Sequence, residues 1–207
     1  MEKQPDNNFM SKILGMSYLI KKEFFRKAIH MMSSFVPFFY YHNRSVVMLG
    51  ILNLGFLYFI SEVLRFNNVK IPIITQMTEQ ASRELDEGKT VLGPITLVIG
   101  IFLAFTFFDY RSAVIAVFAL SFGDGVASLF GKMIGGPKIP FTSGKTFSGS
   151  LGCLTVLLIV FSACGLDLSQ AAFLAVFATS VEAFPTGDYD NLLIPVLTGM
   201  AAQNWIL

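Results

Sequence analysis

The chain has 207 residues, of which 54% are hydrophobic and only 14% are charged. About a quarter of the residues of a soluble domain are charged, so this composition excludes an ordinary soluble domain and predicts an integral membrane protein. The net charge of +1 is uninformative by itself, and we expect no nucleic-acid partner.

From the N-terminus, residues 1–27 lack the pattern of a cleavable signal peptide and predict a polar cytoplasmic tail with a basic interfacial segment. Seven apolar segments follow, and we expect an all-α, polytopic membrane bundle of about seven transmembrane helices in one domain, 28–207. The first segment is short for a span, so six spans with a re-entrant piece is the competing count. The segments are residues 28–42, 45–64, 91–108, 111–134, 147–165, 168–184 and 191–207.

The connections between these segments alternate in length. Those at 42–44, 109–110 and 165–167 are very short, whereas those at 65–90, 135–145 and 185–190 are longer and polar. With the N-terminus on the side of the longer connections, every lysine and arginine except Arg44 and Arg111 lies on that side. The positive-inside rule then places the N-terminus and the polar site in the cytoplasm. Within 65–90, apolar residues at helical spacing also predict an amphipathic helix at the membrane surface.

The fourth segment contains an unexpected side chain, Asp124. A carboxylate in apolar surroundings needs a cation, a metal ion or a proton, so we predict that Asp124 is functional. Ser128, Gly131 and Gly135 continue its helical stripe. For the two glycines, the alternative is that small residues let membrane helices pack closely.

A loop rich in glycine follows between residues 135 and 150. Lys145 and Thr146 come directly before the next predicted helix. Backbone amides at a helix N-terminus bind anions, and a lysine supplies a point charge for phosphate. The spacing of a P-loop is absent, so the loop is a weak signal when taken alone.

A third polar cluster comprises Glu182 and the turn at 185–195, which contains Asp188, Asp190 and Asn191. Oxygen ligands of this kind suit Mg²⁺, which often takes one or two carboxylates together with substrate phosphates. The alternative is a turn in which Asp190 or Asn191 caps the last helix.

Two smaller groups are additional candidates. Arg26, Lys27 and His30 stand at the cytoplasmic end of the first segment, although cations there also anchor helices by snorkelling. Glu62 and Arg65, at the end of the second segment, are either site residues or only an i,i+3 ion pair.

Taken together, these motifs resemble the CTP-dependent lipid-alcohol kinase family, which includes dolichol, phytol and farnesol kinases and the CTP-dependent diacylglycerol kinase. That family is distantly similar to phosphatidate cytidylyltransferase. One departure is Ser148, where the family often has glutamate. The matching pieces, in family order, are Arg26-Lys27-x-x-His30, Gly93-Pro94, Gly123-Asp124-Gly125-x-Ala127-Ser128-x-x-Gly131-Lys132, Lys145-Thr146-x-x-Gly149-Ser150, and Glu182 followed by Asp190-Asn191-x-x-x-Pro195.

The resemblance implies Mg²⁺-assisted transfer of the γ-phosphoryl group of CTP to a membrane lipid alcohol of the diacylglycerol, polyprenol (dolichol) or phytol type. We expect catalytic roles for Asp124, Lys145 and Asp190, with Mg²⁺ held among Asp124, Glu182 and Asp190. Asp124 could instead be the base that accepts the proton of the alcohol. Nucleotide contacts are expected from Ser128, Gly131, Lys132, Lys145, Thr146, Gly149 and Asn191.

Two other functions stay open at this point. A phosphatidate cytidylyltransferase would release pyrophosphate, but such enzymes often carry Ser-Pro before Lys-Thr, where this chain has Ser143-Gly144. A lipid transporter or scramblase with a buried acidic site would need polar residues across the midplane, whereas the ionisable residues here gather on one face. The glycine stripe also leaves a homo-oligomer open.

Overall fold

The computed structural model describes residues 21–67, 69, 90–142 and 144–206. Most of the predicted N-terminal tail, and the amphipathic helix predicted within 65–90, lie outside these residues. Residues 21–32 form one helix, which runs across the predicted domain boundary at residues 27 and 28.

Every regular element in the described residues is helical and none is a β-strand, which confirms the all-α prediction. An isolated bridge joins Lys138 and Thr146. After the helix at 21–32, the elements are η1 (Ser33–Phe35), α2 (Val36–His42), α3 (Arg44–Phe66), α5 (Gly93–Phe107), α6 (Tyr110–Phe118), the π-helix η3 (Ala119–Asp124), α7 (Gly125–Met133), α8 (Phe147–Ala163), α9 (Leu168–Ala183), η4 (Gly187–Tyr189) and α10 (Asp190–Ile206).

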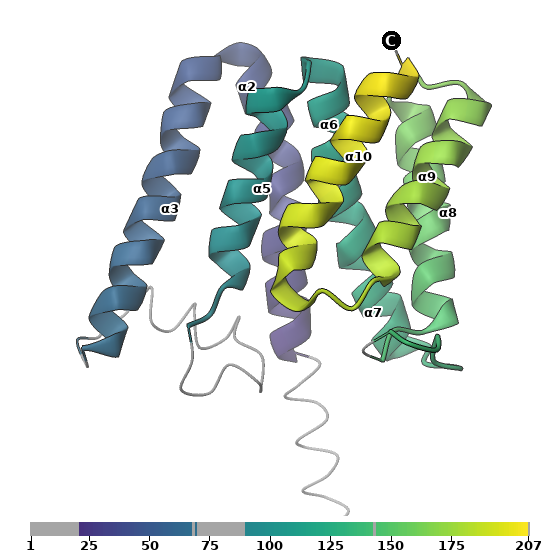
Figure 1. The fold of residues 1–207 in the computed structure, drawn as a ribbon, viewed down its shortest axis with the longest axis horizontal. Coiled ribbons are helices and arrows are strands. Elements are labelled where there is room, and N and C mark those ends of the chain that lie inside the picture. Colours follow the sequence, from purple (N-terminus) through teal and green to yellow (C-terminus); the bar gives the residue numbers. More distant parts are fainter. Residues whose placement is uncertain (1–20, 68, 70–89, 143, 207) are drawn as a thin grey trace, which may run out of the picture.

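Polar caps begin three of the long helices at one end of the bundle. Asn43 accepts a hydrogen bond from the Val46 amide at the start of α3, and Asp109 accepts one from Ser112 at the start of α6. Asp167 forms a capping box at the start of α9. Such caps satisfy amides that a helix leaves unpaired. They confirm the three short connections predicted from the sequence, which lie together at the top of Figure 1.

The opposite end of the bundle carries the polar segments. The helix at 21–32, the end of α7, the start of α8 and the turn between α9 and α10 all reach the lower end in Figure 1. The described connections therefore alternate between the two ends as the sequence predicted.

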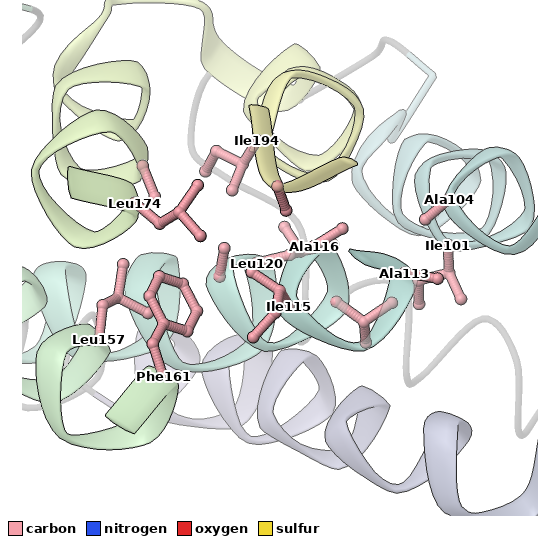
Figure 2. Close-up of a cluster of buried hydrophobic side chains, with 14 of the residues drawn as sticks. Ile101, Ala104, Ala113, Ile115, Ala116, Leu120, Leu157, Phe161, Leu174 and Ile194 are labelled. Carbon is pink, nitrogen blue, oxygen red and sulfur yellow. The ribbon is translucent and has the colours of Figure 1, made fainter. Parts of the chain in front are cut away.

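The core is built around α6 and the π-helix that follows it. Ile115 and Leu120 are fully buried, and Phe161 of α8, Leu174 of α9 and Ile194 of α10 surround them (Figure 2). These aliphatic and aromatic side chains pack against several helices at once. The continuous helix formed by α6, η3 and α7, called the central rod below, therefore lies in the middle of the bundle.

Two of the described helices are long and apolar enough to cross a membrane, namely Arg44–Phe66 and Tyr110–Met133. The most apolar window of the first is only 17% buried, whereas that of the second is 61% buried. Three further apolar helices are shorter, Gly93–Phe107, Phe147–Ala163 and Leu168–Ala183. The count of seven spans therefore stays a prediction.

Glycines bring α7 and α8 into close contact beside the polar end. A Cβ atom on Gly131 would lie 2.9 Å from Thr146 Oγ1, and one on Gly149 would lie 2.5 Å from the Ala127 carbonyl oxygen. Close helix packing therefore accounts for Gly131. It does not account for Gly135, which has open space around it and a φ of +68°, so a left-handed turn after α7 is what requires that glycine.

Candidate active site

A cavity of about 230 Å³ opens at the polar end of the bundle. Its walls come from the helix at 21–32, from α7, from the loop and first turn of α8, and from the turn between α9 and α10. The predicted site residues that line it are Arg26, Lys27, Asp124, Ser128, Gly131, Lys132, Lys145, Thr146, Gly149, Glu182 and Asp190. The structure thus brings together motifs that are far apart in the sequence.

Asp124 lies at the inner wall of the cavity and is held by two side chains of the N-terminal helix. Lys27 Nζ donates to Asp124 Oδ2, and both side chains are only 3% exposed. His30 Nδ1 lies 3.2 Å from the same oxygen. Lys27 and His30 are three residues apart and therefore share one helix face. The buried carboxylate thus has the cation that burial requires.

The backbone around Asp124 is a π-helix rather than an α-helix. The π segment runs over Ala119–Asp124, and α7 continues directly from Gly125. Short π segments inside α-helices often occur at functional sites. On the same segment, the Ser121 hydroxyl lies 2.6 Å from the Ser33 hydroxyl, which joins this rod to η1, directly after the N-terminal helix.

Lys145 reaches from the loop to Glu182 near the end of α9. Its ammonium group donates to the carboxylate Oε1 and to the backbone carbonyl of Glu182. The next residue, Thr146, caps α8 by accepting from the Gly149 amide at 3.2 Å. Ser148, the departure from the family pattern, donates to the Gly135 carbonyl and so holds the loop in place.

The turn between α9 and α10 is braced by α5. Asp190 opens α10 and is 6% exposed at the cavity wall. Asn191 instead turns its amide toward α5, donating to the Gly93 carbonyl at 3.0 Å and to Thr96 Oγ1 at 3.2 Å. Thr96 in turn donates to the Asp188 carbonyl at 2.8 Å. In this structure Asn191 positions the turn and does not line the cavity.

Glu23 is a member of the site that the sequence analysis missed. Its carboxylate accepts hydrogen bonds from Arg26 at 2.7 and 2.8 Å, from Lys132 at 2.7 Å and from Ser128. Burial raises the pKa of Glu23, but the charges of Arg26 and Lys27 and the bonds from Lys132 and Ser128 outweigh it and lower the pKa to about 2. The sequence could have indicated Glu23, because its spacing places it on the same helix face as Arg26, Lys27 and His30.

The remaining candidates, Glu62 and Arg65, form a pair away from the cavity. Arg65 donates to both carboxylate oxygens of Glu62, at 2.7 and 2.9 Å, and Glu62 also accepts from the Val91 amide at 2.8 Å. The i,i+3 ion pair predicted as the alternative is therefore present. The hydrogen bond from Val91 to Glu62 also joins the end of α3 to the segment directly before α5.

The oxygen atoms around the cavity are suited to a hard cation. Within the described residues, no three His, Cys, Asp or Glu side chains are already gathered closely enough to hold a metal ion. However, Glu182 Oε2 is buried and has no hydrogen-bond partner in the part of the chain that the structure describes. Because Mg²⁺ completes its shell with water and substrate phosphates, one or two carboxylates suffice.

The sequence is similar to those of several kinases that act on lipid alcohols. The chain is 27% identical over 155 residues to phytol kinase 1 of Arabidopsis thaliana, which covers 66% of this chain and 51% of that protein. It is 25% identical over 142 residues to CTP-dependent diacylglycerol kinase 1 of Saccharomyces cerevisiae, which covers 67% of this chain and 49% of that protein. The chain is thus similar in sequence to lipid-alcohol kinases, one of which is named as CTP-dependent.

A third relative of this kind is the farnesol kinase of Arabidopsis thaliana, 34% identical over 77 residues, or 36% of this chain and 25% of that protein. The chain spans about half the length of the phytol and diacylglycerol kinases that it matches. No family model matches the chain, and no solved structure matches it at a significant level.

Proposed function

We propose that this protein is a CTP-dependent kinase that phosphorylates a membrane lipid alcohol. The observation that carries the proposal is the convergence of acids, lysines and glycine-rich backbone on one cavity, in a chain whose relatives are phytol, farnesol and diacylglycerol kinases. Phosphoryl transfer requires mainly positioning and neutralisation of charge, which such a set of side chains supplies.

The protein in this proposal is a multi-pass membrane protein with its site at the cytoplasmic surface. The outer face of α3 supports this placement, because Leu49, Phe56 and Phe59 are each more than half exposed and a continuous apolar face of this kind needs a lipid or protein cover. Of the lysines and arginines that the structure describes, all except Arg44 and Arg111 belong to segments at the end of the bundle where the cavity opens. CTP would enter from the cytoplasm and the alcohol from the bilayer.

The phosphates of CTP would bind between α7 and the start of α8. Lys145 is proposed to leave its ion pair with Glu182 and to bind the β- and γ-phosphates instead. Lys132, which also lines the cavity, would contact the same phosphates. Ser150 Oγ lines the same cavity and has no hydrogen-bond partner among the described residues, so it is available to a phosphate oxygen. The glycines of α7 and α8 keep the two backbones close to this position.

Mg²⁺ is the expected cofactor, and Asp124, Glu182 and Asp190 are its proposed ligands. When bound, it would neutralise charge on the β- and γ-phosphates. Asp124 is alternatively the base for the alcohol. The substitution Asp124→Asn distinguishes the two roles. If Asp124 is a metal ligand, the variant needs a higher Mg²⁺ concentration for half-maximal activity. If Asp124 is the base, the variant has a lower kcat at every Mg²⁺ concentration.

The proposal is tested with purified protein, Mg²⁺, and CTP labelled in either the α- or the γ-phosphate. A kinase transfers only the γ-label to a lipid, and a panel of phytol, farnesol, a polyprenol and diacylglycerol identifies the acceptor. Incorporation of the α-label into phosphatidate, with release of pyrophosphate, would identify a cytidylyltransferase instead. Flux of a lipid that depends on Asp124 without nucleotide turnover would identify a transporter.

A further inference from the structure

The carboxylate of Glu23 sits among side chains that are otherwise arranged to bind an anion. Its Oε1 accepts from Arg26 and Ser128, and its Oε2 accepts from Arg26 and Lys132. Three donors from two helices thus converge on two oxygen atoms. Arginine, lysine and a hydroxyl are the side chains that commonly bind phosphate oxygens.

These donors face the cavity and retain capacity for a larger anion. Arg26, Ser128 and Lys132 all line the cavity, while the side chain of Lys132 is 50% exposed. Arg26 Nε is buried and has no hydrogen-bond partner in the part of the chain that the structure describes. A phosphate group has more acceptor oxygens than a carboxylate, so it can satisfy this donor as well.

Displacement of Glu23 would be a movement of its side chain. Glu23 is 5% exposed and lies behind the cavity, held by the lining residues Arg26, Ser128 and Lys132. The inference therefore requires that a change of rotamer withdraws its carboxylate from these three donors. The same arrangement recurs across the cavity, where Glu182 pairs with Lys145.

We propose that Arg26, Lys132 and Ser128 form a phosphate subsite and that Glu23 occupies it until a nucleotide polyphosphate displaces the carboxylate. The inference rests on the proposed function for the identity of the nucleotide, but the subsite itself requires only a polyphosphate. Glu23 then acts as a built-in competitor: it keeps the cations paired in the empty site and weakens nucleotide binding.

The test is calorimetric binding of inorganic tripolyphosphate to the full chain in detergent, comparing the wild type with Glu23→Gln. Glutamine keeps the size of the side chain and removes its charge, so we expect tripolyphosphate to bind roughly tenfold more tightly. Lys132→Gln should bind it several-fold more weakly than the wild type. Glu62→Gln is the matched control, because Glu62 makes the same i,i+3 arginine pair away from the cavity, and its affinity should equal that of the wild type.

The opposite result would overturn the inference. If folded Glu23→Gln binds tripolyphosphate no more tightly than the wild type, Glu23 serves to position Arg26 and Lys132 and is not a competitor. If Glu23→Gln does not fold, Glu23→Asp replaces it in the test. Its shorter side chain withdraws the carboxylate from Lys132, so tripolyphosphate should bind more tightly than to the wild type, by less than tenfold. No gain in affinity rejects the inference.

The binding experiment is independent of the kinase reaction. A protein that binds tripolyphosphate more tightly as Glu23→Gln, yet phosphorylates none of the lipid alcohols, would retain the subsite and lose the proposed function. Active protein in which the affinity of Glu23→Gln is unchanged would retain the proposed function and lose the subsite.

Discussion

Lys27 and Asp124 are 97 residues apart in the sequence and form a buried ion pair at the inner wall of the cavity. This pair joins the N-terminal helix to the central rod at the last residue of the π-helix, directly before α7 begins. The N-terminal helix therefore contributes Arg26 and Lys27 to the wall of the cavity.

Removing one member of this pair should damage both stability and activity. In Lys27→Met, the Asp124 carboxylate loses its lysine partner and keeps His30 beside it. Breaking a buried ion pair on one side costs about 3–5 kcal/mol. If Asp124 has the proposed catalytic role, activity should fall by roughly 100-fold or more, because its carboxylate is no longer fixed. Thermal unfolding in detergent and a kinase assay measure the two effects.

The double variant Lys27→Met, Asp124→Asn provides the control for that experiment. It removes both charges, so the unfolding temperature should recover most of what the single variant lost while activity stays absent. Recovery of activity along with stability would show that the pair has only a structural role.

Lys145 and Lys138 belong to the same loop and offer a matched comparison. Lys145 lines the cavity, whereas Lys138 is exposed and does not line it. Lys145→Ala should raise the KM for CTP by roughly 10- to 100-fold, the value of a charged hydrogen bond. Lys138→Ala should change it by less than about twofold. Equal effects of the two substitutions would mean that only the general positive charge of the loop matters.

Gly149 and Gly50 differ in the space around them, although both lie within helices. A methyl group on Gly149 meets the Ala127 backbone, whereas one on Gly50 of α3 meets nothing within 4 Å. Gly149→Ala should therefore destabilise the protein by about 1–3 kcal/mol by separating α7 from α8. Gly50→Ala should leave the unfolding temperature equal or higher, because alanine favours a helix by roughly 1 kcal/mol over glycine. A neutral Gly149→Ala would show that α7 and α8 do not pack this closely.

The stability contributed by Glu23 should depend on pH in a defined window. Its pKa is lowered from 4.5 to about 2 in the folded protein. The contribution is therefore fully present above pH 4.5 and is lost as the pH falls toward 2; its upper bound is about 3 kcal/mol. Unfolding temperatures of the wild type and Glu23→Gln should differ most at pH 7, differ by roughly half as much at pH 3, and converge only near pH 2. A difference that persists unchanged at pH 3 would mean that the charge of Glu23 is not what stabilises the fold.

Much of the architecture was predictable because local patterns determine it. Apolar segments gave the helices, and short turns at Asp109 and Asp167 could be recognised because aspartate caps the helix that follows. The motifs around Asp124 and Lys145 were also visible, since charge and glycine are unusual in apolar surroundings.

Long-range pairing was not predictable in the same way. Nothing local to Lys27 indicates that it meets Asp124, and nothing local to Asn191 indicates that its amide turns to Gly93 instead of the cavity. The π-helix at Ala119–Asp124 has no signature in the hydrophobic pattern, because its change of register is set by packing against neighbouring helices. Glu23 was overlooked because its contacts are with Lys132 and Ser128, more than 100 residues away.

The most direct test of the central claim is the ratio of products formed from CTP and a lipid alcohol. Mass spectrometry of a reaction with Mg²⁺ should find one CDP for each molecule of lipid phosphate, and Asp124→Asn should form neither. Pyrophosphate in place of CDP, or CDP formed without any lipid phosphate, would contradict the account.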